Sequence, residues 1–293
     1  MAIDAALRQR IAEDFPAFRW LLDVPEVGDL LGKAATEGWD ITKLQAQLYA
    51  TRWWRTTTET QRQAQTLRAT DPASYQEKLA QQRNLIYQEA SRLGVRLHPN
   101  EVKWLQVLAT DNAWSTAQIT KAVAEIVSSK PQRLAGGELA ASIKDVNALV
   151  KSYAYGVTEK TKRDWAVKIA SGSMTIDGIR SMLADGAKRR YGDNAALVSA
   201  IDQGMTVDEY MAPTAALIAQ ELELNADAID WLNPTYNKVL RFTDPSSGTM
   251  RTMTDGEAVQ WARSQGRWRD TGGGKELASQ LVDGLTRKMG ARA

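Results

Sequence analysis

The sequence predicts an all-α protein of capped helical hairpins in series, a solenoid-like arrangement, with at most one short β-hairpin near residues 239–253. Three observations predict this fold. Apolar residues recur at three- and four-residue steps along most of the chain, as on one face of an α-helix. Ser, Thr or Asp precedes many of these stripes, where an N-cap is expected. A pattern of turns and tryptophans occurs twice in the middle of the chain.

Residues 1–94 are expected to form an N-terminal region with long helices. A first stripe within residues 4–13 ends before Phe15-Pro16, because proline interrupts a helix. Its apolar members are Ala5, Leu7, Ile11 and Ala12. A second stripe starts at Asp40 and leads into Trp53-Trp54.

The second half of this region contains signals for both ends of a helix. Asp71-Pro72 is typical of a helix start, and Gly94 stands where a C-terminal glycine is expected. The stripe between them comprises Tyr75, Leu79, Ile86, Ala90 and Leu93. Residues 40–93 are therefore expected to form two long helices, antiparallel or kinked.

Residues 95–240 are expected to form a duplicated helix–turn–helix region. Leu93-Gly94-Val95 is followed by Trp104 and then by Trp114-Ser115. Tyr155-Gly156-Val157 is followed, at nearly the same spacing, by Trp165 and then by Met174-Thr175. We expect residues 93–127 and 155–187 to form equivalent units, with Trp104 and Trp165 in matching buried positions.

Four turns place Trp or Met directly before a capping residue, which is the arrangement of a hydrophobic staple. The pairs are Trp39-Asp40, Trp114-Ser115, Met174-Thr175 and Met205-Thr206. Each Trp or Met is expected to be buried against an apolar partner in the next helix, respectively Leu44, Ile119, Ile179 and Tyr210. Capping boxes are expected at Ser115 with Gln118, Thr206 with Glu209, and Thr254 with Glu257.

Residues 241–293 are expected to contain a β-hairpin, a short helix, a glycine hinge and a last helix. The hairpin would pair residues 239–243 with 249–253 around Asp244–Gly248, and a plain loop is the alternative. Gly272–Gly274 is expected to be a flexible joint before an amphipathic helix. The apolar residues of that helix are Leu277, Leu281, Val282 and Leu285.

Composition excludes several classes of site. The chain has 293 residues, no cysteine and one histidine, so disulfides, cysteine nucleophiles and thiolate or histidine-rich metal sites are excluded. The formal net charge is only +2, which argues against a dedicated nucleic-acid coat or a polybasic membrane binder. No apolar run approaches the roughly 20 residues of a membrane span. We expect no cofactor, no metal and no small-molecule ligand.

The remaining candidates for chemistry have simpler structural explanations. His98 precedes a helix, where a turn or capping role is favoured over a general base. Asp270–Lys275 lacks the spacing, the Ser/Thr and the preceding strand of a phosphate-binding loop. Glu26 and Glu37 lie among apolar residues and are the candidate acids of a glycosidase-type site. Helix capping or solvation is favoured for both.

The helices expected at 116–130 and 176–190 also have the form of DNA-recognition helices. Their basic residues are few or lie mostly at the end where such helices contact bases least. Packing of repeated hairpins is therefore favoured over DNA binding. Ten tryptophans spread evenly along the chain suit core anchors and subunit interfaces better than a ligand platform.

Several segments carry a resemblance to a known group of proteins. They are 15–28, Gly38-Trp39, 51–57, Asp71-Pro72, Tyr155-Gly156-Val157, 201–207 and 221–224. From about residue 15 to about residue 271 the chain resembles uncharacterised virion-associated proteins of tailed phages that infect actinobacteria. The resemblance implies a virion component, made in the cytoplasm of the bacterial host. It carries no catalytic motif and assigns no functional residue.

Together these observations predict a non-enzymatic structural component of a tailed-phage virion, in the tail, tail tip, neck or internal core. Its partners would be other virion proteins and further copies of itself in a symmetric multimer. DNA contact is left open but is not predicted. The alternatives are a peptidoglycan-cleaving virion enzyme and a DNA-binding helix–turn–helix protein. Trp and Arg are enriched at interfaces, so contacts to other chains are expected at 50–70 and 270–293. The candidate interface residues are Trp53, Trp54, Arg55, Arg62, Leu277 and Leu281.

Overall fold

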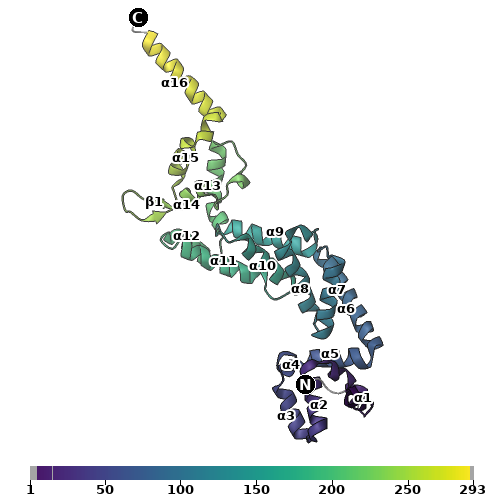
Figure 1. Ribbon diagram of the computed structural model, residues 1–293. Helices are drawn as coiled ribbons and strands as arrows, with labels where there is room; N and C mark the ends of the chain where they lie inside the picture. Colours follow the sequence, from purple (N-terminus) through teal and green to yellow (C-terminus); the bar gives the residue numbers. More distant parts are fainter. Residues whose placement is uncertain (1–4, 15, 291–293) are drawn as a thin grey trace. The chain divides into compact units, whose positions relative to one another are not determined.

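The computed structural model of the chain describes residues 5–14 and 16–290, and side chains within 5–6, 8–13 and 19–282. In this part the protein is all-α, with sixteen α-helices, four short 3₁₀ helices and one two-stranded sheet (Figure 1). The predicted fold class is therefore confirmed. Leu7 and Leu285, two members of the predicted stripes, lie outside the described side chains, and Phe15 lies outside the described residues.

The chain divides into two compact units, Met1–Ala140 and Ala141–Ala293. The helices of the first unit are α1 (Ala5–Asp14), η1 (Pro16–Asp23), α2 (Pro25–Glu37), α3 (Ile41–Ala50), α4 (Arg52–Thr56), α5 (Glu59–Thr70), α6 (Pro72–Leu93), α7 (Pro99–Asp111), α8 (Thr116–Ser129) and η2 (Pro131–Arg133). The next helix, α9 (Gly137–Ser152), begins just before the division.

The core of the first unit forms where α6 packs against α7 and α8 (Figure 1). Ile86 and Leu93 of α6, Leu105 of α7 and Ile119 of α8 are fully buried. Packing therefore crosses residue 94, where the sequence suggested a boundary between regions. The observed division falls instead inside the segment 95–240, because α7 and α8 bury their apolar faces on the preceding helix.

The prediction of two long helices over residues 40–93 is wrong for the first of them, because residues 40–70 do not form one long helix. The segment is broken into α3, α4 and α5 by two threonines that act as N-caps. The side chain of Thr51 accepts from the Trp54 N–H at 3.2 Å, and that of Thr58 accepts from the Gln61 N–H at 3.2 Å in a complete capping box. Each cap satisfies donors at a helix start, and this stabilises a new start over continuation of the preceding helix. Only α6, with 22 residues, is a long helix here.

Three of the four predicted staple turns share one backbone design. The residue before Trp or Met is left-handed, with φ of 63° at Gly38, 47° at Ala113 and 91° at Gly204. In each turn the backbone N–H of the Trp or Met donates to the carbonyl five residues earlier, at the end of the preceding helix. The Trp39 N–H, for example, donates to the Ala34 carbonyl at 3.0 Å. The Trp or Met therefore ends one helix and introduces the next.

The predicted caps of these turns are confirmed. The side chains of Asp40, Ser115, Thr175 and Thr206 each accept from a backbone N–H three residues on. All three predicted capping boxes form. The predicted burial of the Trp or Met before each cap is only partial. Trp39, Trp114 and Met174 are half-buried, and Met205 is 37% exposed.

The two repeated segments each form a helix–turn–helix, but their tryptophans are not equivalent. Trp104 lies five residues after the first residue of α7, and Trp165 lies six after the first residue of α10 (Glu159–Ala170). One residue turns a side chain by about 100° around a helix. Trp104 is accordingly 60% exposed, whereas Trp165 is half-buried, so the prediction of matching buried positions is wrong.

The second unit contains the remaining elements. After α9 and α10 they are α11 (Ile176–Arg190), α12 (Ala195–Asp202), α13 (Val207–Glu221), η3 (Ala226–Ala228), α14 (Pro234–Leu240), β1 (Phe242–Thr243), β2 (Met250–Arg251), α15 (Asp255–Ser264), η4 (Gly266–Asp270) and α16 (Gly272–Gly290). Its core is centred on the fully buried Tyr191 and Trp231, with Leu183, Met211 and Ile218. Trp231 is the one fully buried member of the ten tryptophans, so the expectation that they anchor the core fits this residue alone.

The predicted β-hairpin is present and short. Phe242 pairs with Arg251 and Thr243 with Met250 in antiparallel register. Val239 and Leu240, which the sequence places in the first strand, end α14 instead and are fully buried.

Gly272–Gly274 is not a loop, so the predicted glycine hinge is wrong. These residues form the first turn of α16, and the Gly274 N–H donates to the Thr271 hydroxyl at 3.1 Å as in an N-cap. A Cβ on Gly274 would lie 2.2 Å from the Trp268 carbonyl oxygen. Glycine at this position therefore permits the close approach of α16 to η4.

Candidate functional site

Four aromatic side chains of the first unit form a cluster around α4. We define this tryptophan cluster as Trp20, Tyr49, Trp53 and Trp54. The Trp53 ring meets Trp20 edge-on at 6.1 Å and Trp54 at 6.0 Å, and Trp54 lies 4.7 Å from Tyr49. The sequence identified the adjacent pair but not Trp20 or Tyr49, whose participation depends on the packing of η1 and α3.

The short helix α4 is fixed by contacts at its first turn. The Trp53 N–H donates to a carboxylate oxygen of Glu26 at 3.1 Å, and the Trp53 indole N–H donates to Gln65 at 3.2 Å. A carboxylate at a helix start compensates the partial positive charge of the unpaired N–H groups. Glu26 therefore has a capping contact, which is the role favoured for it from the sequence.

Glu37 has a comparable local contact. Its carboxylate accepts from the Trp39 indole N–H at 2.7 Å and lies 3.9 Å from the Lys43 ammonium. The Lys43 ammonium also lies 4.4 Å from the Trp39 ring centroid. The three side chains form an exposed polar contact over the turn between α2 and α3.

The Arg62 side chain packs within the first unit, against Trp54 and Thr57. Its guanidinium lies 3.9 Å from the centroid of the Trp54 ring and donates to the Trp54 carbonyl at 3.2 Å and to the Thr57 carbonyl. A planar cation stacked on an indole gains cation–π attraction as well as contact area. Arg55 is exposed, and its side chain donates only a long bond of 3.4 Å to the Thr51 carbonyl. Of the two arginines, Arg55 is the one available to another chain.

A shallow apolar hollow of about 490 Å³ lies beside the tryptophan cluster. Its apolar lining comes from three leucines and three members of the cluster, and α5 contributes the polar rim. The leucines are Leu21, Leu48 and Leu67. The hollow brings together Trp53, Trp54 and Arg62, three of the predicted interface residues. It is a concave surface with aromatic walls, which is the type of surface that an apolar side chain of a partner fills.

The other two predicted interface residues lie on α16 of the second unit. Leu277 is 46% and Leu281 is 59% exposed. The helix is held at its beginning, where the Gly272 N–H donates to a Glu223 carboxylate oxygen at 2.7 Å. A polar hollow of about 480 Å³ lies beside this attachment, with Arg263 paired to Glu221 at 2.9 Å. The leucines follow directly after the anchored turn.

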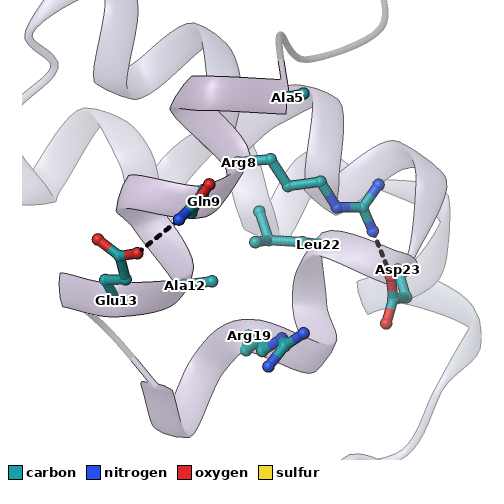
Figure 2. Close-up of a pocket in the computed structure, with 8 residues that line it drawn as sticks. All are labelled: Ala5, Arg8, Gln9, Ala12, Glu13, Arg19, Leu22 and Asp23. Atoms are coloured by element: carbon teal, nitrogen blue, oxygen red, sulfur yellow. Dashed lines mark hydrogen bonds and ion pairs between the residues drawn. The ribbon is translucent and has the colours of Figure 1, made fainter.

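A further hollow, of about 520 Å³, is enclosed by α1 and η1. Figure 2 shows four of its five polar side chains in two pairs around Leu22, Gln9 with Glu13 and Arg8 with Asp23, and Arg19 without such a contact to the residues drawn. Because most of these groups satisfy each other, the hollow has the chemistry of a helix-packing contact. It was not expected from the sequence.

The two candidate recognition helices use most of their cations within the chain. In α8, Lys121 faces Glu125 at 3.8 Å, and the following Lys130 binds Glu101 at 2.6 Å. In α11, Arg180 binds Asp177 at 2.6 Å, and Lys188 lies 3.1 Å from both Asp185 and Asp202. Gln118 is occupied by its capping box.

His98 caps α7, as favoured from the sequence. Its side-chain Nδ1 atom accepts from the Asn100 backbone N–H at 3.2 Å. The backbone N–H of His98 donates to a carboxylate oxygen of Glu101 at 2.7 Å. Glu101 also holds Lys130, and these contacts lower the pKa of its carboxyl, with the Lys130 hydrogen bond the largest cause. Within the described residues, no three His, Cys, Asp or Glu side chains gather where they could share a metal ion.

No protein-family model matches the chain, and no match was found among curated proteins or among solved structures. None of the helices in residues 5–14 and 16–290 is sufficiently long and apolar to cross a membrane.

Proposed function

We propose that the protein is a non-enzymatic structural component of a tailed-phage virion and acts through protein–protein assembly. The resemblance of residues 15–271 to virion-associated proteins gives the setting. The exposed leucines of α16 carry the assembly part of the proposal.

The exposed leucines of α16 would gain free energy from burial against a partner. Full burial of a leucine side chain contributes about 1.5–3 kcal/mol relative to exposure in water. In the isolated chain Leu277 and Leu281 lack a large part of this stabilisation, because their side chains are 46% and 59% exposed to solvent. They are one helical turn apart, so a single partner surface covers both. The anchored first turn of α16 presents them without the entropy loss of ordering a loose segment.

The tryptophan cluster supplies a second surface. Its hollow has aromatic walls, and the exposed Arg55 lies next to Trp54 on α4. Interface hot spots combine aromatic residues and arginine in this way. Two separate surfaces on one chain are suited to an ordered assembly in which each copy contacts more than one neighbour.

Incorporation into particles tests the proposal. We expect L277S/L281S and a chain ending at Thr271 to be depleted from purified particles, as measured by mass spectrometry. The matched control is I41S/Y87S, which changes two other exposed apolar side chains, 73% and 51% exposed. Normal incorporation of both altered chains, or absence of the unaltered protein from particles, would contradict the proposal.

The enzymatic alternative has a separate test. Purified protein is incubated with actinobacterial cell walls, and turbidity is followed. We expect no clearing, and therefore no difference between the unaltered chain and E26Q or E37Q. Clearing that either substitution abolishes would establish a peptidoglycan-cleaving activity instead.

A further inference from the structure

The second unit contains a basic hollow that has no role in the proposed assembly. It has a volume of about 390 Å³ and lies where the ends of α11 and α14 meet the β-hairpin. Three cationic side chains line it, Arg190, Lys238 and Arg241. None of its lining residues is acidic.

These cations differ from several others of the second unit, which are paired with acids. Lys188, Arg251 and Arg263 each bind one or two carboxylates. Lys238 and Arg241, by contrast, form no ion pair with any described residue. Arg190 also forms no ion pair with a described residue, and its guanidinium lies 5.7 Å from the Tyr191 ring centroid. The nearest acid along the hairpin, Asp244, is occupied by Arg251 at 2.7 Å and by Ser246.

Stabilisation of helix ends does not account for all three charges. A helix C-terminus carries about half a negative charge, which nearby cations neutralise. Two helices, α11 and α14, end at this hollow, which gives about one negative charge against three positive ones. A local excess of about two positive charges therefore remains at the hollow. This excess is as large as the formal net charge of the whole chain, which is +2.

The lining also indicates what kind of anion fits. Two guanidinium groups offer paired N–H donors that match the oxygens of a phosphate. The Thr243 hydroxyl adds a further polar group, and Leu232, Pro234 and Met250 provide apolar contact. The lining contains no aromatic side chain of the kind that anchors protein partners. Backbone contacts to nucleic acid are made by this combination of Arg, Lys and Thr.

We propose that this hollow binds the phosphate backbone of nucleic acid, without sequence selectivity. The proposal stands independently of the assembly function. It also differs from the helix–turn–helix alternative, because the cations lie at the ends of α11 and α14 and not along an exposed recognition helix.

The test uses the full chain and fluorescein-labelled double-stranded DNA of mixed sequence, with affinity measured by anisotropy between about 50 and 200 mM salt. The test variant is K238A/R241A. The matched control is K78A/R83A, which removes the same two charges from exposed positions on α6 that have no ion pair with described residues. Far-UV circular dichroism verifies the fold, and R241Q alone replaces the double variant if that variant unfolds.

We expect K238A/R241A to weaken binding about tenfold or more at low salt. We also expect the slope of log affinity against log salt to fall in magnitude by about 1.8, because two phosphate contacts are lost and each releases about 0.9 counterion. The control should change affinity less than about twofold. Equal weakening by both variants, or no measurable binding by the unaltered chain, would overturn the proposal. Competition by poly-glutamate as effective as that by unlabelled DNA would also overturn it, in favour of an acidic protein partner.

Discussion

The hydroxyl of Tyr191 donates a 2.9 Å hydrogen bond to the backbone carbonyl of Ala154 inside the second unit. Both residues are fully buried, and Ala154 has a left-handed backbone with φ of 47°. The Asn237 amide donates to the same hydroxyl at 3.1 Å and to the Trp231 carbonyl at 2.7 Å. One phenol therefore connects the segments that follow α9 and α11 with the middle of α14.

Removing this hydroxyl should destabilise the second unit. Y191F leaves the buried Ala154 carbonyl without its donor, which costs about 1–3 kcal/mol. Burial raises the pKa of Tyr191 above its ordinary value, so the donor stays protonated through neutral pH. Urea unfolding followed by circular dichroism measures the effect. Y87F, at a tyrosine that is 51% exposed, is the control, and equal midpoints for the two variants would contradict the role of the bond.

A glycine should improve the turn between α7 and α8. Ala113 has a φ of 47° and an exposed side chain, so its methyl group incurs the cost of left-handed backbone and gains little burial. We expect A113G to stabilise the first unit by about 0.5–1 kcal/mol, since left-handed backbone costs a non-glycine residue about 1–2 kcal/mol and added chain entropy offsets part of the gain. A46G, within α3, should instead destabilise by about 1 kcal/mol. Thermal unfolding compares the two, and a lower midpoint for A113G would contradict this assignment.

The features predicted correctly from the sequence are those decided within a few residues. Ser115 with Gln118 forms a capping box because both partners lie within one turn. The capping role favoured for His98 is equally local, although its partner Glu101 was not predicted. The breaks at Thr51 and Thr58 have equally local caps, but these two threonines do not stand out in the sequence from the other threonines of 51–70, several of which lie inside helices.

The candidate site depends on contacts between residues that are far apart in sequence. The Trp53-Trp54 pair was visible as a pattern, but its contacts with Trp20 and Glu26 come from elements about 30 residues earlier. Nothing local identifies such partners. The basic hollow has no local signal for the same reason, because Arg190 ends α11, Arg241 follows α14, and the two meet only after folding.

Acid should weaken the hairpin region through a three-residue ion network. Arg251 binds Asp244 at 2.7 Å and Glu257 at 2.7 Å, and its guanidinium lies 4.9 Å from the Phe242 ring centroid. The hydrogen bond from Arg251 lowers the pKa of Glu257 from 4.5 to about 2. Since the folded-state pKa is depressed, the contribution of Glu257 is complete above pH 4.5 and is lost as pH falls toward about 2.

The measurement is the thermal midpoint of the unaltered chain and of E257Q across this pH range. The glutamine keeps an acceptor for the Thr254 cap but cannot pair ionically with Arg251. We expect the unaltered chain to be the more stable of the two at neutral pH, and the difference to shrink as Glu257 is protonated. A difference that stays constant from neutral pH to pH 2 would show that the ion network does not contribute.

The last prediction separates two neighbouring glycines at the start of α16. A Cβ on Gly274 would lie 2.2 Å from the Trp268 carbonyl oxygen, and the residue is buried, whereas a Cβ on Gly273 meets nothing within 4 Å. G274A should therefore displace α16 from η4 and disturb its first turn. G273A should stabilise the helix by about 1 kcal/mol, the difference in helix propensity between glycine and alanine. Limited proteolysis of the region 265–280 is the readout, with faster cleavage expected for G274A and slower cleavage for G273A. A flexible glycine hinge would give the opposite outcome for Gly274, because alanine at either position would then stiffen the joint and slow cleavage in both variants.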